Sequence, residues 1–241
     1  MSPDRPWLSA DKKAIRERVW RELEERQATT FPKPARGRIP NFVGSREAAL
    51  RLRSLQAYRS AKTIFVNPDA AQLPVREMAL RDGKLGVMAT PKLREGFIVL
   101  DPKEIGNARE AATIRGALKC GRKTSIRGIK VDLVVEGSVA CDAKGGRLGK
   151  GGGFGDMEFA ILRQAGAIAD TTPVVTTVHP IQVIDGIPMS QHDAPVDIIV
   201  TPERVIPTAR AHPKPRGIIW ELLPSDAYKR MPVLAELREK P

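Results

Sequence analysis

The residues best suited to chemistry lie in one glycine-rich segment, GGRLGKGGGFGDMEF, which spans residues 145–159. It carries two cations, Arg147 and Lys150, among its glycines and ends in two carboxylates, Asp156 and Glu158. Glycine lets successive backbone N–H groups turn toward one point, because it accepts positive φ and has no Cβ. Arginine and lysine add full charges, and arginine can contact two phosphate oxygens at once. The segment therefore indicates phosphate binding; the alternative that the pattern alone leaves open is a mobile surface turn.

Two known phosphate-binding patterns are absent from this segment. The Walker sequence G-x-x-x-x-G-K-[ST] does not occur, and GKGGGFG lacks the early βαβ context and later ribose-binding acid of a dinucleotide fingerprint. Asp156 stands where a helix is expected to begin, so it is suited either to cap backbone N–H groups or to hold Mg²⁺. The metal role requires the phosphates of a nucleotide as further ligands.

A predicted strand precedes the segment and a predicted helix follows it. Strands are expected at residues 62–67, 84–91, 97–102, 131–137, 138–142, 173–180, 196–202 and 217–224. Helices are expected at about 9–27, capped by Ser9, and at 46–58, 73–82, 107–121 (ending at Gly121) and 156–166. This alternation predicts an α/β layered domain with a mostly parallel or mixed sheet. Ligands of such sheets bind at the carboxyl ends of the strands.

An N-terminal helical arm is expected to pack on this domain. Ile15, Val19 and Leu23 recur every four residues and form an apolar stripe. Lys12 and Arg16 are also four apart, which places them together on another face of the helix. From the residues alone, that face is a solvated one. The chain is accordingly divided into an arm with a Pro-rich connection, the α/β domain and a C-terminal extension, at residues 1–44, 45–205 and 206–241.

The net charge of +12 is compatible with an anionic partner, namely nucleic acid, a membrane surface or a phosphorylated ligand; the alternative is that Arg and Lys only keep the surface solvated. Aromatic residues make up only 5% of the chain, and no ribonucleoprotein-type strand motif occurs, which weakens the nucleic-acid interpretation. The sequence has no run of about 18 apolar residues and no secretory signal at its start. Cys120 and Cys141 form neither a metal-like spacing nor a disulfide framework. We therefore expect a cytoplasmic protein that does not bind membranes.

Four segments in order resemble the 5-formyltetrahydrofolate cyclo-ligases, also called methenyltetrahydrofolate synthetases. RLGKGGGFGD is similar to their signature RLG-x-G-x-G-[YF]-Y-D, and KKAIR to their opening Lys and Arg. VDLVVEGSVACDAKGGRLG resembles the strand and loop before the signature. TTVHPIQVIDGIPMSQHDAPVDIIVT resembles the late segment with a Gln, a Pro and H-D-x-x-[VL]-D. The likeness covers roughly residues 10–205 and implies a three-layer α/β/α sandwich.

The resemblance also implies a reaction. Enzymes of this family use Mg-ATP to phosphorylate the formyl oxygen of 5-formyltetrahydrofolate, after which ring closure releases phosphate and yields 5,10-methenyltetrahydrofolate and ADP. The catalytic positions map to Arg147 and Lys150, and Gln182 maps to a substrate position. The nucleotide-binding positions map to Lys12, Arg16, Gly149, Gly151, Gly152, Gly153 and Phe154. The implied magnesium ligands are Asp156 and Asp193.

The chain departs from the family pattern on the folate side. The second aromatic of the signature is replaced in Phe154-Gly155-Asp156-Met157, and a folate-facing glutamate is missing near Ala71 and Leu73. These departures make the chain more similar to the methenyltetrahydrofolate synthetase domain-containing paralogues. The sequence thus predicts an ATP-dependent ligase that acts on 5-formyltetrahydrofolate or a related small molecule. The alternative is a non-catalytic nucleotide- or RNA-binding module that reuses the fold.

Overall fold

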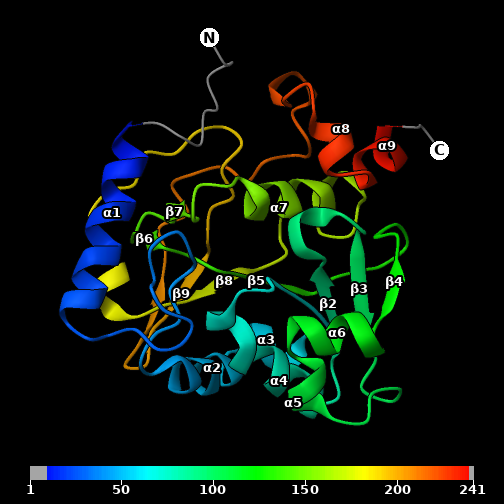
Figure 1. Cartoon of the computed structure of the whole chain (residues 1–241), viewed down its shortest axis with the longest axis horizontal. Helices are drawn as coiled ribbons and strands as arrows, with labels where there is room; N and C mark the ends of the chain where they lie inside the picture. Colours follow the sequence, from blue (N-terminus) through cyan, green and yellow to red (C-terminus); the bar gives the residue numbers. More distant parts are fainter. Residues whose placement is uncertain (1–9, 239–241) are drawn as a thin grey trace.

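The computed structural model describes residues 10–238, and its centre is an eight-stranded sheet in the order β10-β9-β8-β5-β1-β2-β3-β4 (Figure 1). The strands are β1 Thr63–Val66, β2 Leu85–Ala89, β3 Phe97–Leu100, β4 Arg122–Thr124, β5 Leu133–Glu136, β8 Val174–Thr177, β9 Ile198–Val200 and β10 Val205–Pro207. β9, β8, β5, β1 and β2 run parallel, whereas β3, β4 and β10 are antiparallel to their neighbours. The predicted mixed, mostly parallel sheet is confirmed.

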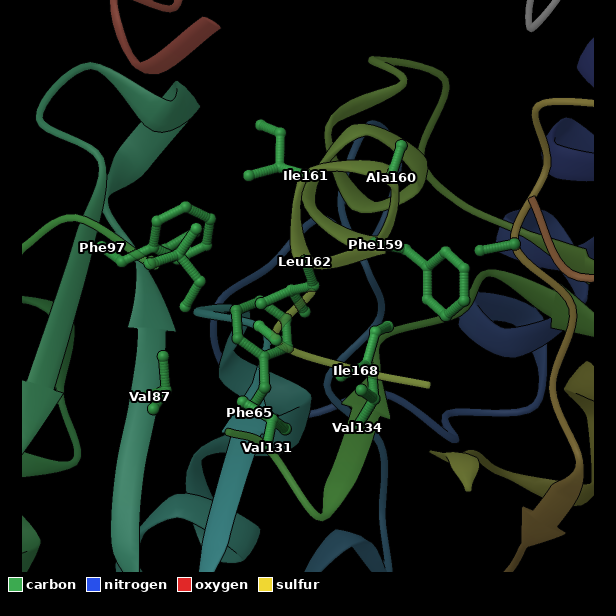
Figure 2. Close-up of a cluster of buried hydrophobic side chains, with 14 of the residues drawn as sticks. Phe65, Val87, Phe97, Val131, Val134, Phe159, Ala160, Ile161, Leu162 and Ile168 are labelled. Carbon is green, nitrogen blue, oxygen red and sulfur yellow. The ribbon is translucent and has the colours of Figure 1, made fainter. Parts of the chain in front are cut away.

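Helices cover both faces of the sheet and make three layers. On one face lie α2 Ser45–Arg53, α3 Gln56–Ser60, α4 Leu73–Arg81, α5 Ala108–Ala111 and α6 Ile114–Cys120. On the other face lies α7 Phe154–Gln164. Side chains alternate along each strand, so Ile64 packs with α2 and α4, whereas Phe65 points to the opposite face, toward Leu162 of α7 (Figure 2). The central strands β1, β5 and β8 are buried along nearly their whole length because both faces of the sheet are covered there, whereas the edge strand β4 is largely exposed.

The N-terminal helix α1, Ala10–Glu25, packs beside a small two-stranded sheet of β6 Ala140–Cys141 and β7 Arg147–Leu148. Its expected N-cap, Ser9, lies outside the described residues. Val19 and Leu23 are buried as predicted, but Lys12 and Arg16 continue the same buried face rather than lying on a separate solvated one. The solvated-face interpretation was wrong, because the glycine-rich loop and its neighbours cover this end of the helix.

Local capping explains two differences from the predicted helices. The expected helix at residues 107–121 is split into α5 and α6, because Thr113 accepts a hydrogen bond from the Gly116 N–H and so starts a new helix. Gly121 does follow the second helix, with an extended conformation. The expected helix at 46–58 is likewise divided at Leu55 into α2 and α3.

Further differences concern short elements. The strand expected at residues 217–224 was wrong, because this stretch contains a 3₁₀ turn, η5 Trp220–Leu222. Its apolar residues pack against other parts of the chain instead of pairing in the sheet. The helix after the glycine-rich loop begins at Phe154, two residues earlier than predicted. β4, β7 and β10 were not predicted, since each has only two or three residues.

The C-terminal segment folds onto α7 through two short helices, α8 Ala227–Arg230 and α9 Val233–Arg238 (Figure 1). Ala227 and Leu234 are fully buried in the same cluster as Phe159. Residues 218–238 therefore belong to the main hydrophobic core. No helix within residues 10–238 has the length and apolarity needed to cross a bilayer.

Candidate functional site

A cavity of ≈ 290 Å³ opens where β1 and β5 end at their carboxyl side. The loop after β1 contributes Asn67 and Asp69, and Gly137 follows β5 directly. The glycine-rich loop, Arg16 of α1 and the first turns of α7 complete the lining. The structure thus places the predicted phosphate loop at the edge of the sheet where α/β proteins bind ligands.

The glycine-rich loop lines this cavity, and several of its backbone N–H groups have no acceptor among the described residues. Gly151 and Gly153 have φ of +98° and +70°, and Gly153 is the N-cap of α7. Among the described residues, no atom accepts a hydrogen bond from the N–H groups of residues 150–153. The first turn of α7 adds further N–H groups that have no intrahelical acceptor, together with the positive end of the helix dipole. This arrangement is suited to bind an anion.

Arg16 lies against the loop from the α1 side. Its Nε donates to the Gly149 carbonyl oxygen at 2.7 Å. A Cβ built on Gly151 would lie 3.4 Å from the Arg16 guanidinium carbon, so the loop and this cation are in close contact. Burial lowers the pKa of Arg16 below its ordinary value, although Asp156 and Asp193 oppose this effect. The Arg16 side chain is thus held beside the unaccepted N–H groups.

Lys12 lies one turn before Arg16 and forms a buried ion pair with Asp193. The Asp193 carboxylate also accepts a hydrogen bond from the Ser190 N–H at 2.6 Å. This ion pair joins two residues that are 181 positions apart in the sequence. Lys12 therefore anchors α1 to the late segment that carries Asp193, which lines the cavity.

Arg147 lies at the floor of the cavity and is committed to protein acceptors. Its side chain is 1% exposed and donates to the carbonyl oxygens of Ala194 and Gly137 and, at 2.5 Å, to Asp156 Oδ1. Burial alone would lower the pKa of Arg147, but the carboxylates of Asp156 and Glu136 raise this pKa above its ordinary value. In this arrangement Arg147 orients Asp156, and the direct phosphate contact expected from the sequence stays a prediction.

Lys150 extends from the loop across the cavity mouth. Its Nζ lies 2.7 Å from Asp69 Oδ1, and its side chain is 40% exposed. An exposed ion pair of this kind contributes little to stability, so it can be exchanged for another anion at small cost. Of the two predicted catalytic cations, Lys150 is therefore the one that solvent and ligands can reach, since the Arg147 side chain is 1% exposed.

Hydrogen-bond acceptors gather at the other end of the cavity, near Gly137. Gln72 is fully buried, and its Oε1 accepts no hydrogen bond from a described residue. A Cβ built on Gly137 would lie 2.8 Å from Gln72 Oε1 and 3.3 Å from Asp69 Oδ2. Asn67 Nδ2 donates to Glu158 Oε2 at 2.6 Å, and Glu158 also lines the cavity. Asp69 and Glu158 line this end of the cavity and are suited to a ligand with N–H groups, whereas Gln72 does not line it.

Sequence reasoning missed this acceptor cluster. Asn67 and Asp69 follow β1, and Glu136 ends β5, so polar residues at the carboxyl ends of parallel strands were the available signal. The family's folate-facing glutamate is missing near Ala71 and Leu73. Gln72, which lies between these two residues, places its side chain next to Gly137.

Gly155 stands where the family signature has its second aromatic residue, and the structure leaves little space for a side chain there. A Cβ on Gly155 would lie 3.1 Å from Glu136 Oε2 and 3.3 Å from Arg147 Nη1. Glu136 is fully buried, and its nearest ion-pair contact is Arg147 Nη1 at 3.7 Å. The buried Glu136–Arg147 pair therefore closes off the space beside residue 155.

The remaining predicted residues divide into two groups. Phe154 lines the cavity as the first residue of α7, together with the predicted loop glycines. Gln182 does not line it, because its side chain caps the 3₁₀ turn η4 Pro180–Gln182 and donates to the Ser138 carbonyl oxygen. Asp156 and Asp193 both line the cavity, each beside a buried cation. Within residues 10–238, no three His, Cys, Asp or Glu side chains are grouped to hold a metal ion.

Glu136→Gln should change how stability depends on pH. Burial raises the pKa of Glu136 from 4.5 to about 7, although Arg147 lowers it. Between these values the native protein holds a proton that the unfolded chain has lost, so this group's contribution to stability falls as pH rises. The fall amounts to about 3 kcal/mol.

Glu136→Gln removes this pH-dependent contribution to stability. Urea unfolding of both proteins from pH 4.5 to pH 8 should show the variant gaining stability relative to wild type as pH rises, with a plateau above pH 7. Parallel stability profiles for the two proteins would contradict a raised pKa of Glu136.

Comparisons with known proteins identify the family of this chain. The sequence model of the 5-formyltetrahydrofolate cyclo-ligase family matches residues 8–202. The chain is 44% identical over 239 residues to the mouse (Mus musculus) methenyltetrahydrofolate synthase domain-containing protein, with 95% of this chain and 63% of the relative covered. The human (Homo sapiens) protein of the same name is 38% identical over 243 residues, with coverage of 97% and 63%. The chain thus spans somewhat less than two thirds of these curated relatives.

A solved structure supports the fold. The Aquifex aeolicus 5,10-methenyltetrahydrofolate synthetase superposes with a TM-score of 0.51 at 21% sequence identity, covering 83% of this chain and 93% of that one. The predicted resemblance to the family, and to its domain-containing paralogues in particular, is confirmed.

Proposed function

Because the chain belongs to the 5-formyltetrahydrofolate cyclo-ligase family, we propose that its cavity binds ATP and directs phosphoryl transfer to the carbonyl oxygen of a formyl or amide group. The reaction is 5-formyltetrahydrofolate plus ATP to 5,10-methenyltetrahydrofolate, ADP and phosphate, or the same activation of a related small molecule. Phosphorylation turns a poor leaving group, an amide oxygen, into a good one. The protein then has mainly to position the two reactants and spread the phosphate charge.

The observation that carries the proposal is the row of unaccepted N–H groups at residues 150–153, at the start of α7. These groups would bind the phosphates, with Arg16 beside them. Lys150 would leave Asp69 and contact the transferred phosphoryl group. Asp69 would thereby be released close to the acceptor cluster.

Magnesium fits this site only together with the nucleotide. Mg²⁺ commonly uses one or two carboxylates plus substrate phosphates, which agrees with the small number of carboxylates at the cavity. Asp156 is the residue that would hold the ion, because Arg147 and the Ala194 N–H engage only its Oδ1 and its side chain is 14% exposed, against 5% for Asp193. Bound there, the ion would neutralise charge on the phosphates.

The acceptor cluster would bind the second substrate. Asp69 and Glu158 line this end of the cavity and are suited to N–H groups on a heterocycle or amide, and an unmatched acceptor at the buried Glu158 is costly. The space beside Gly155 lacks the aromatic ring that the family signature places there. We therefore expect this chain to select its substrate through hydrogen bonds more than through stacking at that position.

Lys150→Ala should weaken ATP binding by about 10-fold or more, because one charge-assisted hydrogen bond is lost. Titration calorimetry measures the affinity, and the absorbance of methenyltetrahydrofolate follows turnover of 5-formyltetrahydrofolate. Lys103→Ala is the matched control, since Lys103 is exposed and lies outside the cavity lining.

The outcomes separate the parts of the proposal. Wild-type affinity in Lys150→Ala would remove the loop from the nucleotide site. ATP binding that depends on Lys150, without turnover, would keep the phosphate site and move the search to other formyl or amide compounds.

The net charge of +12 favours a second candidate, a non-catalytic RNA-binding module. Binding through phosphate contacts weakens steeply with salt. Fluorescence anisotropy with a labelled polynucleotide from 25 mM to 200 mM salt tests it, and absence of binding at the lowest salt removes it.

A further inference from the structure

The half-buried aromatic ring of Phe154 is in contact with two segments that are distant in sequence. It lies against the glycine-rich loop, since a Cβ built on Gly152 would lie 3.0 Å from Phe154 Cδ2. The guanidinium carbon of Arg230 lies 5.8 Å from the ring centroid, in a cation–π contact. The ring thus connects the candidate phosphate loop with α8.

Arg230 is held in place by the folded C-terminal segment. It forms an ion pair with Asp226 at 3.8 Å, one helical turn earlier. Its neighbours Ala227 and Met231 are 0% and 5% exposed and pack in the core cluster that contains Phe159 of α7. Figure 1 shows α8 and α9 beside α7. Because one face of α8 is buried, the helix that carries Arg230 is packed onto the core beside α7.

We propose that Arg230 is a positioning residue for the glycine-rich loop. It holds the Phe154 ring against Gly152, so that the N–H groups of residues 150–153 are already directed into the cavity when a nucleotide arrives. A loop ordered in advance binds with less loss of conformational entropy. Arg230 lies beyond residues 8–202, the span of the family match, so this part of the site belongs to the C-terminal segment.

The effect on nucleotide affinity rests on the proposed function, whereas the effect on the loop does not. Amide hydrogen exchange of residues 149–155, without nucleotide, measures the order of the loop directly. Titration calorimetry with ATP measures its consequence for binding. Wild-type protein that binds no ATP would overturn the proposed function and leave the exchange measurement as the test of Arg230.

Arg230→Ala should speed exchange in the loop and weaken ATP binding, each by about 2- to 5-fold, the size expected from a partly exposed cation–π contact. Arg230→Lys should restore much of both, because an ammonium also interacts with the ring. Arg238→Ala is the matched control: Arg238 stacks on Tyr228 at 5.6 Å in the same segment. It should leave both quantities unchanged.

A double-mutant cycle tests the path through Phe154. If Arg230 acts on the loop through the ring, Phe154→Leu combined with Arg230→Ala should weaken binding no more than Phe154→Leu alone. Additive effects would overturn the proposal. Loop exchange in Arg230→Ala that matches both wild type and Arg238→Ala would also overturn it.

Discussion

Arg147→Met should lower the free energy of unfolding by about 3–5 kcal/mol, the cost of leaving buried charge without its partner. The variant removes a cation that is 1% exposed and bonded to Asp156, and that lies 3.7 Å from Glu136. It also leaves the carbonyl oxygens of Ala194 and Gly137 without a donor. Chemical denaturation with two spectroscopic probes measures the loss.

Arg81→Met is the control for this variant. Arg81 is 61% exposed and pairs with Glu77 one turn away, so its replacement should change stability by about 0.5 kcal/mol or less. Adding Glu136→Gln to Arg147→Met should recover part of the stability, because one unpaired carboxylate is removed. Equal losses in the Arg147 and Arg81 variants would mean that the buried network contributes no more than a surface pair.

Gly151→Val should weaken ATP binding by about 100-fold, as expected if two charge-assisted hydrogen bonds to phosphate are lost. Gly151 has φ of +98°, where a β-branched residue is strained, and the Arg16 guanidinium would be in contact with the new side chain. Both effects turn the loop N–H groups away from the cavity. Titration calorimetry with ATP checks the prediction.

A second glycine separates strain from site geometry. Gly128 has φ of +81° with no atom within 4 Å of a built Cβ, and it does not line the cavity. Gly128→Val should therefore lower stability through strain and leave ATP affinity unchanged. If Gly151→Val also retained its affinity, the backbone of this loop would not bind the phosphates.

The sequence alone determined the layered fold and the position of the glycine-rich loop. Apolar runs such as that of β5 mark strands buried on both faces, and this pattern is local. Glycines between a strand and a helix are also a local signal, and they correctly placed the loop of residues 149–153 at the start of α7. The ordered motifs were specific enough to identify the family.

The ends of helices and strands were harder to predict from the sequence. Thr113 divides one expected helix because its side chain competes for the backbone N–H of Gly116. Residues 217–224 have the composition of a strand, but tertiary packing on α7 gives them a 3₁₀ turn. In both places a weak local preference was decided by neighbouring contacts.

Only the tertiary structure decided what each polar residue faces. Lys12 has the sequence context of a surface residue, yet in the structure it is buried and forms an ion pair with Asp193. Arg147 looked like a phosphate ligand, yet Glu136 and Asp156 surround it. Burial, ion pairing and the pKa values that depend on them arise from residues brought together across the whole chain, and no local pattern encodes these distances. The sequence therefore determined which chemistry is available, and packing decided which side chains can reach a ligand.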